Sequence, residues 1–315
     1  MTEALIEVRN LAKNFGSFPA LSDISFQIHR GEFFGLLGPN GAGKTTTLNL
    51  LTGLMQPNRG VILLDGEKLS AHPRKYKSSF GFVPQDFAFY PSLTGLDNLC
   101  FFGRLYGLWG KKLRSRVSSV LDTVQLSDRK NQMVATYSNG MKRRLNIAIA
   151  LLHQPRLLIL DEPTVGVDAQ SRHAIFEALQ RLNRDGLTIL FTTHIMEEAE
   201  RYCQRVAIMD QGRIIALDTP GRLINTLSRA VAVIAVDQPI DEDLQKNLSP
   251  WGSFFLVREN KMHLVLKGEE KIETLGRVLE ILRRRNLRVK SFSLLDANLE
   301  TVFLRLTGKE LRDEG

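Results

Sequence analysis

The chain has 315 residues, of which 43% are hydrophobic and 24% are charged, and its formal net charge is +8. This length and composition are ordinary for a soluble globular protein of about two domains. The two cysteines, Cys100 and Cys203, do not suggest a disulfide framework or a zinc site, and we expect neither a signal segment nor the ~20-residue apolar helix that crosses a bilayer.

Strand-like and helix-like segments alternate through residues 1–225, which is the pattern of an α/β domain with a largely parallel sheet. Continuous apolar runs predict strands that are buried on both faces. These runs are Glu32–Leu37, Leu157–Leu160, Thr188–Thr192 and Arg205–Met209. Helices are predicted at about Gln170–Asn183 and directly after His194, where the sequence MEEAE places acidic residues in a first turn, as the helix dipole favours.

The pattern changes near Arg229, so we expect one domain over residues 1–229 and a second over residues 230–315. The second domain is predicted to contain, in order, a strand at Ala230–Val236, a helix at Asp241–Asn247, strands at Phe254–Val257 and Met262–Leu266 that turn at Glu259–Asn260, a helix at Glu270–Arg285, a strand at Arg288–Leu294 and a helix at Leu299–Leu306. The order β-α-β-β-α-β suggests a small α+β, ferredoxin-like unit. Stabilising a dimer, regulating its closure and contacting lipid all stay open as its role.

The segment GPNGAGKT at residues 38–45 follows the apolar run EFFGLL and opens a helix, so it fits the pattern G-x-x-x-x-G-K-[ST] in its required context. Glycines let backbone N–H groups converge on an anion at a helix N-terminus. Lys44 would bind the β- and γ-phosphates, and the Thr45 hydroxyl would bind Mg²⁺. The predicted cofactor-binding residues here are Gly38, Pro39, Asn40, Gly41, Ala42, Gly43, Lys44, Thr45 and Thr46.

Polar residues follow three further apolar runs. Asp161 and Glu162 end LLILDE, where Asp161 can hold Mg²⁺ and Glu162 can polarise a water for attack on the γ-phosphate. His194 ends TILFTTH and can bond to the γ-phosphate or to that water. Gln85, in FVPQD, can reach the metal and the water with its amide. The sequence therefore predicts Thr45, Gln85 and Asp161 as metal ligands and Glu162, His194 and Gln85 as catalytic residues.

Taken together and in this order, these segments resemble the nucleotide-binding subunit of an ABC (ATP-binding cassette) transporter. The resemblance covers about residues 4–222 and is carried by GPNGAGKT at 38–45, Gln85, YSNGM at 137–141, LLILDE at 157–162, VGVD at 165–168 and His194. It implies a P-loop NTPase of the ABC type, with a helical signature subdomain at about residues 86–155, that hydrolyses ATP in the presence of Mg²⁺.

The resemblance also implies roles for individual residues of this chain. Glu162 matches the general base, His194 the switch histidine, Asp161 the metal carboxylate and Gln85 the loop that senses Mg²⁺ and faces a membrane partner. The other matches are Phe15, which would stack on adenine, Asp168, which would face the opposite subunit, and the signature residues Ser138, Asn139 and Gly140, which would reach the γ-phosphate bound by the other protomer. Function would therefore require a dimer, either of two copies or with a paralogous cassette.

The signature of this chain departs from the usual L-S-G-G-Q, because Asn139 replaces a glycine and Met141 replaces a glutamine. Asparagine tolerates positive φ better than most residues, and the effect of both changes on hydrolysis stays open. The segments YSNGMKRRL, FFGRLYGL at 101–108 and LETVFLRLTG at 299–308 resemble exporter cassettes whose membrane permease is a separate chain. Such exporters act in drug resistance, sodium efflux and nodulation-factor or polysaccharide export. This likeness places the chain on the cytoplasmic face of the inner or plasma membrane, with no specific nucleic acid as partner, and it leaves the cargo open.

Lys142, Arg143 and Arg144 follow the signature and open a predicted helix, although cations are unfavourable at the positive end of the helix dipole. Two interpretations stay open. Either the three cations form a solvated edge, or they face the ATP phosphates held by the opposite subunit.

Two other hypotheses compete with the exporter subunit. A soluble ABC ATPase acting on nucleic acid or ribosomes would fit the mild positive charge, but the chain has one phosphate loop and too few residues between Lys44 and Tyr137 for a long coiled coil. An unrelated P-loop kinase or switch GTPase would leave His194 and the Ser-Asn-Gly turn unexplained.

Overall fold

The structure is a computed structural model that describes residues 3–71, 76–226, 231–258, 260–266 and 271–308. The chain divides into two compact units, one over residues Met1–Ile195 and Tyr202–Ile214 and the other over Met196–Arg201 and Ile215–Gly315. The predicted domain boundary after residue 229 falls outside the described residues and stays a prediction.

The strands up to Asp218 are β1 (Ala4–Phe15), β2 (Phe18–His29), β3 (Phe33–Leu37), β4 (Arg59–Leu64), β5 (Glu67–Lys68), β6 (Phe80–Val83), β7 (Leu157–Asp161), β8 (Thr188–Thr193), β9 (Arg205–Asp210) and β10 (Arg213–Asp218). The helices of the first unit are α1 (Lys44–Leu51), α3 (Gly95–Leu105), α4 (Gly110–Thr123), α5 (Asn139–Leu151) and α6 (Ala169–Arg184), with 3₁₀ turns at Ser127–Arg129 and Val134–Thr136. The four predicted strands correspond to β3, β7, β8 and β9, and the predicted helix at Gln170–Asn183 corresponds to α6. Their predicted ends are confirmed to within a residue or two.

The central sheet contains the strands β9-β3-β8-β7-β6 in this order, and each neighbouring pair is parallel. All residues of β3, β7 and β8 are buried, which explains their apolar runs. Because parallel strands end at one edge, the segments after β3, β7 and β8 meet there. In the register of this sheet Asp161 lies beside Thr192, so two polar side chains share that edge.

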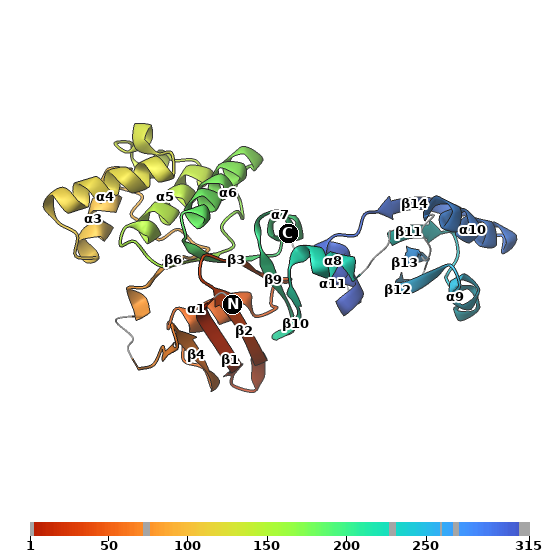
Figure 1. The fold of residues 1–315 in the computed structure, drawn as a ribbon. Coiled ribbons are helices and arrows are strands. Elements are labelled where there is room, and N and C mark those ends of the chain that lie inside the picture. The colour runs from red at the N-terminus through yellow and green to blue at the C-terminus, as the bar shows by residue number, and fades with distance from the viewer. Residues whose placement is uncertain (1–2, 72–75, 227–230, 259, 267–270, 309–315) are drawn as a thin grey trace. The chain divides into compact units, whose positions relative to one another are not determined.

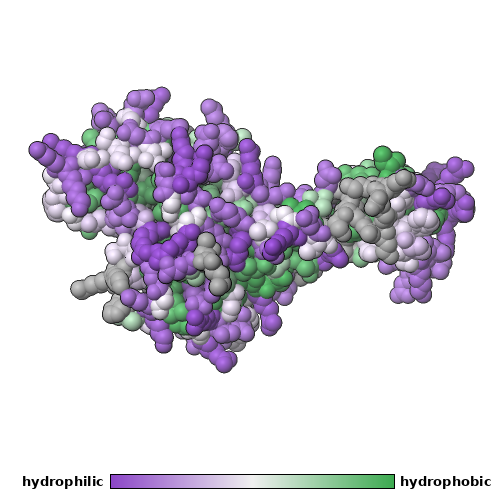
Figure 2. Space-filling model, in the orientation of Figure 1, coloured by the Kyte–Doolittle hydropathy of each residue, from purple (hydrophilic) through white to green (hydrophobic). Residues whose placement is uncertain are grey.

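A second sheet, with the order β2-β1-β4-β5, is antiparallel and lies beside α1 (Figure 1). Helices α3, α4 and α5 gather in a separate helical region, which corresponds to the predicted signature subdomain (Figure 1). Leu145, Ala148 and Ile149 of α5 are buried together with the residues between them, and Leu152, which caps the helix, is buried as well. On the face drawn in Figure 2, hydrophilic side chains cover much of this helical region, with hydrophobic patches between them.

The second unit contains α7 (Met196–Tyr202) except for its last residue, Tyr202, which belongs to the first unit. It also contains α8 (Pro220–Asn225). It continues with β11 (Val231–Val236), α9 (Glu242–Leu248), β12 (Gly252–Arg258), β13 (Lys261–Leu266), α10 (Lys271–Arg284), β14 (Val289–Leu295) and α11 (Leu299–Thr307). Three residues of the predicted elements lie outside the described residues. They are Ala230 at the start of the first predicted strand, Glu259 in the predicted turn and Glu270 at the start of the second predicted helix. Over the described ranges, no helix combines the length and the apolar character that crossing a bilayer requires.

The sheet of the second unit has the order β12-β13-β11-β14, and each neighbouring pair of strands in it is antiparallel. Strand β13 therefore lies between β11 and β12, which α9 connects, and this is the split βαβ arrangement. Alternate residues of β11 and β13, such as Ile234 and Leu264, pack with Leu244 of α9 and Val278 of α10 in one core. The predicted ferredoxin-like topology is confirmed.

Candidate nucleotide and metal site

The loop between β3 and α1 is built around glycines with left-handed backbone. Gly38, Gly41 and Gly43 have φ values of 153°, 81° and 102°. A Cβ atom at Gly38 would lie 2.4 Å from the backbone oxygen of Met209, and one at Gly43 would lie 2.6 Å from Cδ2 of Leu21. A side chain is therefore excluded at both positions, and the loop can present its N–H groups ahead of α1, as a phosphate site requires.

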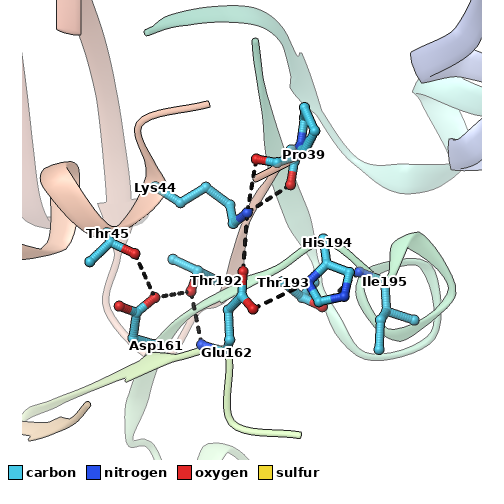
Figure 3. A network of polar contacts seen from close by, with 10 residues as sticks. Pro39, Lys44, Thr45, Asp161, Glu162, Thr192, Thr193, His194 and Ile195 are labelled. Carbon is cyan, nitrogen blue, oxygen red and sulfur yellow. Dashed lines mark hydrogen bonds and ion pairs between the residues drawn. The ribbon is translucent and has the colours of Figure 1, made fainter. Parts of the chain in front are cut away.

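Lys44 is the first residue of α1, and its side chain is only 5% exposed. Its Nζ donates to the backbone oxygens of Gly38 at 2.8 Å and Pro39 at 3.1 Å, and it lies 3.1 Å from Oε1 of Glu162. Figure 3 shows this ammonium pointing from the loop toward the carboxylate that follows β7. The cation predicted to bind phosphate is thus held at the edge where the strands end.

Asp161 ends β7 and is buried, with its Oδ1 as the meeting point of two hydroxyls. Thr192 donates to Oδ1 at 2.6 Å, and Thr45 donates to it at 3.4 Å (Figure 3). Burial raises the pKa of Asp161, and the two hydroxyl groups and Lys44 oppose this rise. The donors here are all oxygen atoms, as Mg²⁺ prefers, so Thr45 and Asp161 fit the metal predicted for them.

Glu162 lies between Lys44 and His194. Its Oε1 faces Lys44, and its Oε2 lies 3.2 Å from Nδ1 of His194 (Figure 3). Its backbone N–H donates to Oγ1 of Thr192 at 3.0 Å, and its φ of 44° is in the left-handed region, which is uncommon for glutamate. Such backbone strain often occurs at functional sites, and the carboxylate is placed to accept a proton from a water molecule.

Thr192 is a residue of this network that the sequence did not single out. Its hydroxyl donates to Asp161 and accepts from the N–H of Glu162, so it orients both acidic residues. The run TILFTTH is typical of a buried strand rich in β-branched residues. The feature that marks Thr192 is its position beside Asp161 on the neighbouring strand. This position can be inferred only once the order of the strands is known.

Two predicted residues lie outside this network. The ring of Phe15 is 48% exposed at the end of β1, with Nζ of Lys13 5.5 Å from its centroid, so it is accessible to a base. Gln85 is exposed after β6, and its backbone oxygen accepts a bond from Nη2 of Arg143 at 2.7 Å. The roles of both residues stay predictions.

The signature segment begins α5, and Ser138 caps this helix by accepting from the N–H of Met141 at 3.2 Å. Asn139 is the first residue of the helix, so it has no need of the left-handed backbone considered above. Its Nδ2 donates to the backbone oxygen of Gly166 at 3.3 Å. The signature therefore contacts the VGVD segment within a single protomer.

Asp168 ends the VGVD segment and caps α6 by accepting from the N–H of Ser171 at 2.9 Å. Hydrogen bonds from Ser171 lower the pKa of this exposed carboxyl. Ser171 also faces Gly140, because a Cβ at Gly140 would lie 2.2 Å from Oγ of Ser171. The starts of α5 and α6 thus pack too closely for any side chain at residue 140.

We expect Gly140→Ala to lower the free energy of unfolding by about 1–3 kcal/mol, because the added methyl group overlaps Ser171 and forces the two helix starts apart. Urea denaturation followed by circular dichroism measures this change. Gly276→Ala is the matched control, since an added Cβ there meets no atom within 4 Å. Wild-type stability of the Gly140 variant, or failure of Ser171→Gly to restore stability in the double variant, would contradict this contact.

Two of the three cations that follow the signature, Arg143 and Arg144, fit neither interpretation given above. Arg143 is only 2% exposed and donates to the backbone oxygens of Pro84 and Gln85, both at 2.7 Å. Arg144 donates from Nη1 to the oxygens of Val124 at 3.0 Å and Gln125 at 3.1 Å. Carbonyl groups at the negative end of α4 therefore offset the charge of Arg144. The structure leaves the role of Lys142 open.

Residues 21–165 match a family model described as ABC transporter. The chain is 37% identical over 311 residues to the linearmycin resistance ATP-binding protein LnrL of Bacillus subtilis (strain 168), and this match covers 98% of the chain and 100% of that protein. The chain belongs to the ABC transporter family of ATP-binding proteins. Another ABC relative is the Nod factor export ATP-binding protein I of Paraburkholderia xenovorans (strain LB400), 40% identical over 318 residues, with 99% of this chain and 100% of that protein covered.

Solved structures of ABC cassettes share the fold. One of them is the structure of an ATP binding subunit of an ABC transporter, which is 35% identical to this chain and has a TM-score of 0.64. The match covers 71% of this chain and 93% of that subunit. The dimeric bacterial ABC transporter cassette MJ0796 has a TM-score of 0.63 and 28% identity and covers 68% of this chain and 98% of its own. The predicted ABC-type ATPase is confirmed, and the kinase and GTPase hypotheses are wrong.

Proposed function

We propose that this ABC ATPase is the energy-coupling subunit of an exporter, that two such cassettes close on ATP at the cytoplasmic face of the membrane, and that a separate permease carries the cargo. The names of the relatives, which refer to Nod factor export and linearmycin resistance, support export over the hypothesis of action on nucleic acid or ribosomes. The single structural observation that carries the proposal is the network in which Lys44 and His194 both contact Glu162, while Thr192 bonds to Glu162 and to Asp161.

The chemistry proposed for this network follows from its geometry. Lys44 and the loop N–H groups bind the β- and γ-phosphates, while Phe15 stacks on the adenine ring. Mg²⁺, which Thr45, Asp161 and the amide of Gln85 are proposed to hold, would offset phosphate charge when bound. Glu162 accepts a proton from the attacking water. His194, whose Nδ1 lies 3.2 Å from Oε2 of Glu162, orients this carboxylate.

Dimer closure is proposed to bring the signature of one cassette to the phosphates bound by the other. The packing of α5 against the start of α6 supports this, because it holds Ser138 and Asp168 in one rigid element of the protomer. The two residues predicted to face the opposite subunit would therefore arrive together. The partner cassette is a second copy or a paralogous chain.

An aromatic surface beside the loop of Gln85 is the proposed docking site for the permease. We define this surface by Phe87, Phe89, Tyr90, Phe101 and Phe102. The rings of Phe87 and Phe89 stack at 5.4 Å, and Tyr90 meets Phe101 edge to face at 5.1 Å. Exposed aromatic groups that pack against one another in this way are typical of protein interfaces.

We expect this ATPase to co-purify from native membranes with a polytopic membrane protein, and we expect Phe101→Glu to reduce its recovery because the variant places a charge in the aromatic surface. Mass spectrometry of pull-downs made in nucleotide-free buffer measures this. Phe18→Glu is the matched control, since Phe18 is an exposed phenylalanine on the antiparallel sheet. If nucleic acid or ribosomes co-purify and a membrane protein never does, the exporter function is wrong.

A further inference from the structure

The loop at residues 84–88, PQDFA, is held from one side by two side chains of α5. Arg143 donates from Nη1 to the oxygen of Pro84 and from Nη2 to the oxygen of Gln85, both at 2.7 Å. One turn further along the helix, Asn146 accepts from the N–H of Ala88 at 3.1 Å and donates to the oxygen of Asp86 at 3.3 Å. Every residue of this loop except Phe87 thus exchanges a main-chain hydrogen bond with α5.

The two side chains that hold the loop are buried and chemically well matched to it. Arg143 is 2% exposed and Asn146 is 3% exposed. The guanidinium carbon of Arg143 lies 5.1 Å from the centroid of the Phe87 ring, so a cation–π contact adds to its two hydrogen bonds. Burial lowers the pKa of Arg143, and the nearby carboxylates of Asp161 and Asp86 oppose this effect. The planar fork of arginine offers two separate nitrogen donors, Nη1 and Nη2, one for each of two successive carbonyl groups.

Each end of this assembly carries a predicted function. The loop contains Gln85 and joins the aromatic surface through Phe87. The helix begins at the signature, one turn before Arg143, with Ser138 as its N-cap. The same four hydrogen bonds therefore connect the partner-facing loop to the segment that would reach the opposite ATP.

We propose that Arg143 and Asn146 are positioning residues that lock the 84–88 loop to α5, so that Gln85 and Ser138 move as one body. This inference deepens the proposed function and rests on it for the role of Gln85 in hydrolysis. A partner that displaces the loop displaces the signature by the same motion, and a signature drawn toward ATP carries Gln85 toward the metal site.

Arg143→Lys tests this inference because it keeps the positive charge and replaces the two donor nitrogens of the planar fork by a single one. We expect kcat for ATP to fall about 10- to 100-fold, as misplacement of a catalytic group by about 1 Å does, while the KM for ATP stays within about twofold because the phosphate loop is untouched. Hydrogen–deuterium exchange should show faster exchange of the Ala88 amide. Arg116→Lys is the matched control, since Arg116 also donates to two successive carbonyls, those of Leu151 and Leu152, and does not touch the loop.

A double variant separates positioning from mere structural support. If Arg143 acts through Gln85, Arg143→Lys should reduce kcat little further in a Gln85→Ala background, whereas two independent effects would multiply. Asn146→Ala should give the same non-additive result, and it replaces Arg143→Lys if that variant does not fold. Wild-type kcat in both single variants, or fully multiplicative effects with Gln85→Ala, would overturn the inference. A wild-type protein without ATPase activity would instead overturn the proposed function.

Discussion

Glu162→Gln is expected to lower the rate of ATP turnover by about 10²- to 10⁴-fold while ATP still binds, because an amide cannot accept the proton of the attacking water. The amide keeps the size of the carboxylate, so the contacts of Glu162 with Lys44 and His194 should change little in geometry. Phosphate release measures turnover, and a fluorescent ATP analogue measures affinity. We further expect the variant to accumulate as an ATP-bound dimer in size-exclusion chromatography.

Glu32 provides a matched control for the loss of a buried carboxylate. It is also buried, and its Oε1 lies 3.1 Å from Nη1 of Arg205. This ion pair does not include any residue of the phosphate loop. Glu32→Gln should therefore keep its turnover number, even if its unfolding temperature falls. Undiminished hydrolysis by Glu162→Gln would remove Glu162 from the mechanism and assign the proton to another group.

Lys44→Ala should weaken ATP binding by about 10- to 100-fold, since a charge-assisted hydrogen bond to phosphate contributes about 1.5–3 kcal/mol. It should also lower the free energy of unfolding by about 3–5 kcal/mol, because the buried carboxylate of Glu162 loses its cation and two backbone oxygens lose a donor. Nucleotide titration below the unfolding temperature measures the first effect, and urea denaturation measures the second.

A second substitution separates these two effects of Lys44→Ala. Adding Glu162→Gln removes the unpaired carboxylate, so the double variant should recover stability and should not recover affinity. Lys111→Ala, at an exposed site in α4, should leave both quantities unchanged. Normal ATP affinity in Lys44→Ala would argue against the assignment of the phosphate loop.

The sequence was most informative where one short segment determines its own geometry. The glycines before Lys44 dictate a loop at a helix start, and parallel apolar runs that end in Asp161 and His194 must converge at one edge of a sheet. The alternation of elements after residue 230 likewise sufficed for the topology of the second unit. In these cases local chemistry and strand direction already contain the answer.

Contacts between distant segments through main-chain groups could not be predicted in the same way. Arg143 bonds to the oxygen of a residue 58 positions earlier, and any residue type offers such an oxygen, so no pattern of side chains marks the partner. The charges that looked misplaced at the start of α5 are satisfied by carbonyls of a loop and of a neighbouring helix end. Thr192 escaped notice for a related reason, because its role depends on which strand lies next to β7.

The pairing of Lys44 with Glu162 has a consequence for the timing of the reaction. One ammonium group faces both the carboxylate and the place where the γ-phosphate is proposed to lie. While Lys44 holds Glu162, its ammonium lies 3.1 Å from Oε1 and occupies one oxygen of the carboxylate that is proposed to accept the proton. Arrival of the phosphate would draw Lys44 away and leave this oxygen free to face the attacking water. In an ATPase built in this way, the substrate itself would release the carboxylate that acts in its cleavage.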